Sequence, residues 1–114
     1  LISKMVKVIS IGRDSACEIS IPDQSVSRNH AQIFISNSGR LYLIDCKSSF
    51  GSFIINRDQK RQISQSEITV NDNLCFGNYE MSGQELYMKI RNSLNYLQTG
   101  MHTARRLSRR LIGN

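Results

Sequence analysis

Short runs of alternating apolar and polar residues, each ended by turn residues, recur along the chain as far as Ile90. Such alternation is typical of strands with one buried face. It predicts strands over Met5–Ile11, Glu18–Ile21, Ala31–Ile35, Leu41–Ile44, Ser52–Ile55, Glu67–Val70, Leu74–Phe76 and Leu86–Ile90. No long helical period precedes residue 91. Many short strands with turns between them indicate an all-β fold, an antiparallel sandwich over residues 5–90.

The periodicity changes after Ile90, where a helical wheel separates the side chains into two faces. One face is apolar and consists of Leu94, Leu97, Met101, Ala104, Leu107 and Leu111. The opposite face is polar and basic, with Gln98, His102, Arg105, Arg106, Arg109 and Arg110. Residues 91–114 are therefore expected to form a C-terminal basic amphipathic α-helix, weakened by Gly100.

The net charge of +6 is unevenly distributed. Ten basic and nine acidic residues lie from Leu1 to Ile90, so this part carries +1. The segment from Arg91 to Asn114 has five arginines and no acidic residue, and it carries +5. Basicity therefore belongs to the C-terminal segment and says little about what the body of the protein binds.

Length and cysteine usage narrow the class of protein further. The 114 residues suffice for one domain with a single core. No run approaches the roughly 18 apolar residues of a membrane span, and the first residues lack the apolar stretch of a secretory signal. Cys17, Cys46 and Cys75 are odd in number and lack metal-ligand spacing. We expect reduced thiols in a cytoplasmic protein without a metal or cofactor.

Three predicted loops carry side chains suited to a phosphate group. Gly12 and Arg13 end the first strand, Ser25–His30 precede another, and Ser48–Ser52 form the third loop. If these loops converge at one end of a sandwich, they offer guanidinium groups, hydroxyls and backbone N–H groups. Arginine binds a phosphate dianion bidentately, and hydroxyls and amides fill its remaining lone pairs. From composition alone, a phosphate-binding site is one interpretation of these loops among several.

Four motifs occur in order along the chain: Ile11-Gly12-Arg13 with Ile19–Asp23, then Val26–Ala31, then Asp45–Ser52, then Asp72–Gly77. Together they resemble the signature of the forkhead-associated (FHA) domain family over about residues 6–90. The resemblance implies a β-sandwich that recognises phosphothreonine peptides through loops at one end. Carried over by position, Arg13 would bind the phosphate and Ser27 would hydrogen-bond it. Arg28 would contact the phosphate or the adjoining peptide, and Ser49 would donate from the third loop.

Other motif residues are structural or depart from the family pattern. By resemblance, His30 would brace the loop that presents Ser27, and Gly12 and Gly51 would have structural roles. The family's asparagine before the glycine, which clamps the peptide backbone, is Phe50 here. An aromatic ring cannot make those amide hydrogen bonds. Phe50 is then either a packing residue or an apolar contact for a ligand.

The same residues also allow functions other than phosphopeptide binding. Each loop residue could instead be an ordinary surface or turn residue. Ser27, His30 and Asp45 raise the question of a hydrolase, but no nucleophile elbow accompanies them and we expect no enzyme. The alternative is a phosphate-independent assembly module that uses the C-terminal helix and a sheet edge exposed by a missing first strand.

The basic helix itself has three interpretations. It can pack on the sandwich or on its own copy, which would make a homo-oligomer. It can dock on a protein partner or an anionic membrane surface. It can contact nucleic acid through its arginines, although the chain offers no recognition helix and few aromatic residues to stack on bases, so we do not expect sequence-specific binding.

Overall fold

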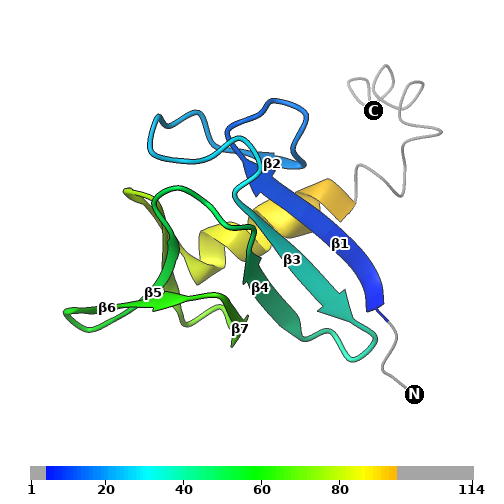
Figure 1. Cartoon of the computed structure of the whole chain (residues 1–114). Coiled ribbons are helices and arrows are strands. Elements are labelled where there is room, and N and C mark those ends of the chain that lie inside the picture. The colour runs from blue at the N-terminus through cyan, green and yellow to red at the C-terminus, as the bar shows by residue number, and fades with distance from the viewer. Residues whose placement is uncertain (1–4, 95–114) are drawn as a thin grey trace, which may run out of the picture.

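Nine strands in the described residues, 5–94, of the computed structural model form two sheets. The strands are β1 (Met5–Gly12), β2 (Ile19–Ser20), β3 (Ala31–Ser36), β4 (Leu41–Asp45), β5 (Ser52–Asn56), β6 (Gln59–Ile63), β7 (Gln65–Ile68), β8 (Asn73–Phe76) and β9 (Tyr79–Ser82). One sheet has the order β2-β1-β3-β4-β7 and the other β6-β5-β8-β9 (Figure 1). The predicted β-sandwich is confirmed.

Strand register explains which residues are buried. Ile9 on β1 lies opposite Ile33 on β3, which lies opposite Leu43 on β4. Because side chains alternate along a strand, these three share one face of the sheet, and all are fully buried. Strand pairs are antiparallel except the short β1–β2 pair, which is parallel.

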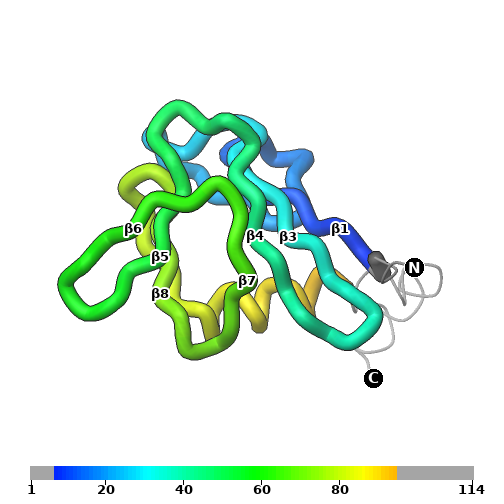
Figure 2. The backbone as a smooth tube through the Cα atoms, turned by 60° about the horizontal axis from the view of Figure 1, so that its bottom comes forward, coloured from blue at the N-terminus to red at the C-terminus, as the bar shows by residue number. Residues whose placement is uncertain are grey.

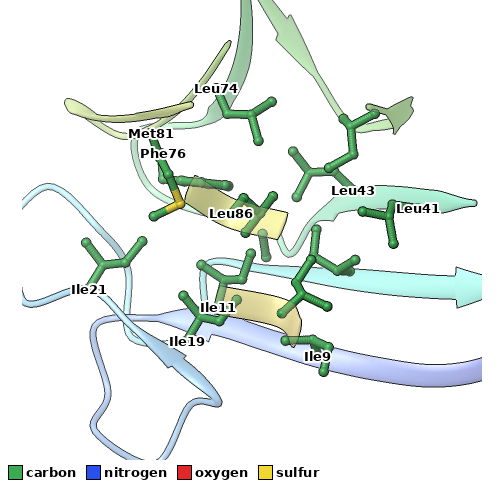
Figure 3. Packing of buried hydrophobic residues seen from close by; sticks show 14 of the residues in the cluster. Ile9, Ile11, Ile19, Ile21, Leu41, Leu43, Leu74, Phe76, Met81 and Leu86 are labelled. Carbon is green, nitrogen blue, oxygen red and sulfur yellow. The ribbon is translucent and has the colours of Figure 1, made fainter. Parts of the chain in front are cut away.

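The core fills the space between the sheets (Figure 3). The first sheet contributes Ile9, Ile11 and Leu43, and the second contributes Leu74 and Phe76, each without exposed surface. Full burial of an aliphatic or aromatic side chain of this size contributes about 1.5–3 kcal/mol. The core therefore supplies the stability that allows polar loops to be held at its end.

Two strands carry little sequence signal and were not predicted. β6 is polar and exposed along Gln59–Gln62, and only Ile63 at its end is buried. It is an edge strand that pairs with β5 through a tight hairpin, whose turn holds Arg57 at a φ of 59°. β9 is four residues long and also lies at an edge. β7 begins and ends two residues before the predicted Glu67–Val70 strand.

The predicted strand over Leu86–Ile90 is wrong, because residues 83–94 form a helix. Leu86, Met88 and Ile90 alternate as in a strand, but Leu86, Ile90 and Leu94 also recur at helical spacing. The Ser82 hydroxyl oxygen accepts a hydrogen bond from the Glu85 N–H at 3.0 Å. This contact is typical of a helix N-cap. Serine followed three residues later by glutamate is the capping-box pattern, so the sequence did contain a signal for this helix.

The helix completes the core rather than standing apart from it. Leu86 and Ile90 are buried members of the core cluster, and Leu94 packs against the same cluster. Tyr87 lines a shallow groove with Leu41, Ile68 and neighbouring residues of β4 and β7. In the view of Figure 2 the helix lies in the lower part of the molecule, while the β4–β5 loop lies at the upper end. The rest of the predicted amphipathic helix, residues 95–114, lies outside the described residues.

All three cysteines are free thiols in the described structure. Cys17 and Cys75 are buried and Cys46 is half-buried. Burial raises the pKa of each of them, which favours the unreactive thiol form. Separately, no helix within residues 5–94 is long and apolar enough to cross a membrane.

The helix makes a testable prediction about two neighbouring apolar residues. Leu86→Ala should lower the free energy of unfolding by about 2–5 kcal/mol because it opens a cavity in the core. Met88→Ala should change it by less than about 0.5 kcal/mol because Met88 is 61% exposed. Urea unfolding of both variants measures the difference. Equal losses would contradict the helix, since a strand would place both side chains on one face.

Candidate phosphate-binding site

Arg13 lies immediately after β1, where its side chain is anchored to the neighbouring loop. Its Nε donates a hydrogen bond to the Val26 carbonyl at 2.9 Å, and its main-chain N–H donates to the Ser27 carbonyl at 2.9 Å. The side chain is otherwise exposed. Because Nε is used in this way, both terminal nitrogens of the guanidinium remain to bind a ligand bidentately.

Ser27 joins the β2–β3 loop to the β4–β5 loop. Its hydroxyl oxygen accepts a hydrogen bond from the Ser49 N–H at 3.0 Å. Accepting this bond leaves the hydroxyl proton of Ser27 to donate to a ligand. Three predicted site residues, Arg13, Ser27 and Ser49, are thus linked directly through Ser27. In Figure 2 the three loops lie together at one end of the sandwich.

His30 connects the same two loops through its two ring nitrogens. Its Nδ1 accepts a hydrogen bond from the Ser27 N–H at 3.0 Å, and its Nε2 lies 2.9 Å from the Gly51 carbonyl oxygen. A backbone N–H can only donate, so Nδ1 must hold a lone pair and Nε2 must carry the proton donated to Gly51. The ring is fully buried and meets the Phe76 ring edge-on, with centroids 5.8 Å apart.

Two glycines permit the close approach of these loops. A Cβ on Gly12 would lie 1.9 Å from the Arg28 carbonyl oxygen, so any side chain there would push the two loops apart. Gly51 has a φ of +91°, which disfavours other residues. Its N–H donates to the Ser48 hydroxyl at 2.9 Å, and its carbonyl accepts from the Gly77 N–H at 2.9 Å as well as from His30.

Asp45 organises the β4–β5 loop from its start. Its carboxylate accepts hydrogen bonds from the Ser48 hydroxyl at 2.6 Å, the Ser52 hydroxyl at 2.7 Å and the Ser48 N–H at 3.0 Å. Burial by itself would raise the pKa of Asp45, but these hydrogen bonds outweigh it and the pKa is lowered. His30 Nε2 lies 3.8 Å away, too far for a hydrogen bond.

The β8–β9 turn supports the β2–β3 loop, which carries Ser27, through a contact with Ser25. The Asn78 N–H donates to the Ser25 hydroxyl at 2.8 Å, and that hydroxyl donates to Asp23 at 2.6 Å. Gly77 has a φ of +62°, and a Cβ there would lie 2.2 Å from the Ser25 carbonyl oxygen. Hydrogen bonds from the Ser25 side chain and N–H lower the pKa of Asp23.

Arg28 and Phe50 flank the linked residues. The Arg28 carbonyl accepts hydrogen bonds from the Asp14 N–H and the Cys17 thiol, both at 3.3 Å, and its side chain is exposed. Phe50 follows Ser49 directly and is 62% exposed. Phe50 therefore lies outside the core, and its predicted role as an apolar contact for a ligand stays a prediction.

Ser27 and His30 do not form a nucleophile and base. His30 Nδ1 accepts the Ser27 backbone N–H rather than its hydroxyl proton, and Nε2 donates to Gly51. A serine hydrolase needs the imidazole to accept the hydroxyl proton. Within residues 5–94, no group of three or more histidine, cysteine, aspartate or glutamate residues could hold a metal ion.

Sequence reasoning missed two supporting contacts. One is the Val26 carbonyl that anchors Arg13, which leaves no mark in the sequence because every residue has such a group. The other is the contact of Ser25 with the β8–β9 turn. Aspartate followed two residues later by serine, as in Asp23 and Ser25, is a turn pattern that could have indicated an ordered loop.

Comparison with known proteins agrees with this geometry. The FHA domain family model matches residues 9–77, which is more than half of the chain. The chain belongs to the FHA domain family. The predicted family is thereby confirmed. No curated protein matches the sequence.

Solved FHA structures share the fold of this FHA domain. The FHA domain of CT664 from Chlamydia trachomatis is 27% identical, with a TM-score of 0.57, and the match covers 68% of this chain and 74% of that one. The N-terminal FHA domain of Rad53p from S. cerevisiae, solved in complex with a phosphothreonine peptide, is 27% identical with a TM-score of 0.50, covering 60% and 54%. A structure from a study of phosphothreonine-dependent FHA domain interactions is 24% identical with a TM-score of 0.58, covering 66% and 73%.

The lowered pKa of Asp45 predicts a pH-dependent contribution to stability. A depressed folded pKa stabilises the domain above about pH 4, where an unfolded aspartate ionises, and this contribution is lost as the pH falls through the folded value. The difference in unfolding free energy between wild type and Asp45→Asn should therefore be largest at neutral pH. It should shrink as the pH falls from about 4, where an unfolded aspartate takes up its proton, through the lowered folded pKa, below which Asp45 is neutral like asparagine.

Urea unfolding at pH 7 and pH 3 measures this difference. Asp58→Asn, in the exposed β5–β6 turn, is the matched control and should change stability little at either pH. A difference for Asp45→Asn that is the same at both pH values would show that the charge of Asp45 is not what stabilises the loop.

Proposed function

We propose that this FHA domain recognises a phosphorylated protein or peptide, with phosphothreonine as the group bound. The observation that carries the proposal is the direct linkage of Arg13, Ser27 and Ser49 at one end of the sandwich. These residues come from three separate loops, and hydrogen bonds hold them together. Such an arrangement brings hydrogen-bond donors from three loops to the same end of the sandwich.

A phosphate monoester fits these donors by charge and by number. It carries about −1.5 to −2 charges at neutral pH and has three acceptor oxygens. The Arg13 guanidinium can bind two of its oxygens, and the Ser27 hydroxyl can donate to the third. Ser49 and Arg28 are exposed, and Arg28 follows Ser27 directly, so the proposal assigns the Ser49 hydroxyl and the Arg28 guanidinium as further donors. A carboxylate would use fewer of them.

Hydrogen bonds within the protein hold the proposed binding groups in position. Arg13 is fixed by Val26, and Ser27 is fixed through its N–H by His30 and through its hydroxyl by Ser49. Groups held in this way lose little conformational entropy on binding. Threonine is preferred to serine in the proposal by family resemblance, since the domain of Rad53p is solved with a phosphothreonine peptide.

Titration of a phosphothreonine peptide library tests the proposal. Arg13→Ala should weaken binding about 10- to 100-fold, because a charge-assisted hydrogen bond contributes about 1.5–3 kcal/mol. Arg61→Ala, an exposed arginine on β6, is the control and should bind as wild type does. Unphosphorylated peptides should bind neither protein. Equal binding by wild type and Arg13→Ala, or no preference for phosphate, would contradict phosphopeptide recognition.

A further inference from the structure

Phe50 is a large apolar side chain placed at the rim of the candidate phosphate site. It is 62% exposed, whereas the core residues of the described structure are almost completely buried. The other exposed large apolar residues in the described part are Val70, Tyr87 and Met88, which lie after β7 and on the helix. Phe50 is therefore separate from them and adjoins the residues proposed to bind phosphate.

The backbone on both sides of Phe50 is held by hydrogen bonds. The preceding Ser49 N–H donates to the Ser27 hydroxyl, and the following Gly51 N–H donates to the Ser48 hydroxyl. The Gly51 carbonyl accepts two more hydrogen bonds, from His30 and Gly77. The exposure of Phe50 is thus a property of an ordered loop, and the ring is presented at a defined place.

Exposing an aromatic ring forgoes the free energy that its burial would contribute. A ligand that covers the ring recovers part of this free energy. Consecutive Cα atoms are about 3.8 Å apart, so Phe50 begins within one residue of the Ser49 N–H that contacts Ser27. A peptide whose phosphate reaches Ser27 therefore has residues close enough to cover the ring.

The charges around the loops decide which side chain the ring would accept. An aromatic face can contact either an apolar group or a cation. Arg13, Arg28 and Lys47 are all exposed at this end of the sandwich. Asp14, Asp23 and Asp45 also lie at this end, and each carboxylate accepts hydrogen bonds within its own loop, from Ala16, Ser25 and Ser48 respectively. The charged side chain nearest to Phe50 along the chain is the exposed Lys47, which disfavours lysine or arginine on a ligand residue that covers the ring, so an apolar side chain is favoured.

We infer that Phe50 determines the peptide specificity of this domain. Resting on the proposed function, the inference is that Phe50 packs against a large apolar side chain beside the phosphothreonine of the ligand. The ligand class is therefore a phosphothreonine peptide with an apolar neighbour and few basic residues. Recognition through a side chain takes the place of the backbone clamp that an asparagine would supply at this position.

A double-mutant cycle between protein and peptide tests this inference. The phosphothreonine library is first screened on the full chain to find the flanking position at which wild type enriches an apolar residue. Fluorescence anisotropy then compares that peptide with one carrying serine at the same position. Wild type should bind the serine peptide about tenfold more weakly, the effect of losing roughly 1.4 kcal/mol of apolar contact. Phe50→Ala should bind both peptides with equal, reduced affinity.

Matched variants make each outcome informative. Met88→Ala removes a side chain of equal exposure on the helix and should bind both peptides as wild type does. The inference is overturned if Phe50→Ala keeps the wild-type affinities and preference, or if Phe50→Asn tightens binding without losing the apolar preference. In those cases loss of binding by Arg13→Ala still supports the proposed function. Absence of any Arg13-dependent phosphopeptide binding overturns both.

Discussion

The buried imidazole of His30 is the interaction on which the arrangement of the loops depends. It accepts the Ser27 N–H on one side and donates on the other to the carbonyl of Gly51, which lies 21 residues after His30, and so joins the two loops. Full burial makes both bonds costly to lose, because an unpaired polar group there would have no water to replace its partner. Together with the Ser49 N–H, which donates to the Ser27 hydroxyl, this ring sets the position of Ser27 relative to the β4–β5 loop.

The remaining contacts build outward from that connection. Ser27 is also held by the Ser49 N–H, and the Asp45 carboxylate orders the turn that carries Ser49. The absence of a side chain at Gly12 lets β1 approach Arg28 closely enough for Arg13 to reach Val26. The exposed groups of the candidate site are thus held by buried or half-buried hydrogen bonds. The residues that make these hydrogen bonds are in turn held in place by the apolar core.

Residue patterns predicted this structure where burial alternates, and failed where it does not. β3, β4 and β5 were found because one face of each is buried, while polar β6 carries no such alternation. The segment from Leu86 to Ile90 fits both a strand and a helix, and the Ser82 cap with the burial of Leu94 favours the helix. The candidate site residues were assigned by family resemblance and their binding roles stay predictions, whereas the Val26 anchor required coordinates because a backbone carbonyl is common to every residue.

The tautomer of His30 tests the account most directly. A long-range ¹H–¹⁵N correlation spectrum of the histidine rings, recorded for the free domain and with a phosphothreonine peptide, reports which nitrogen carries the proton. The account predicts a neutral His30 ring protonated at Nε2, with Nδ1 as acceptor, in both states. A proton on Nδ1, or a tautomer that changes when the peptide binds, would contradict the claim that His30 holds the two loops in a preformed site.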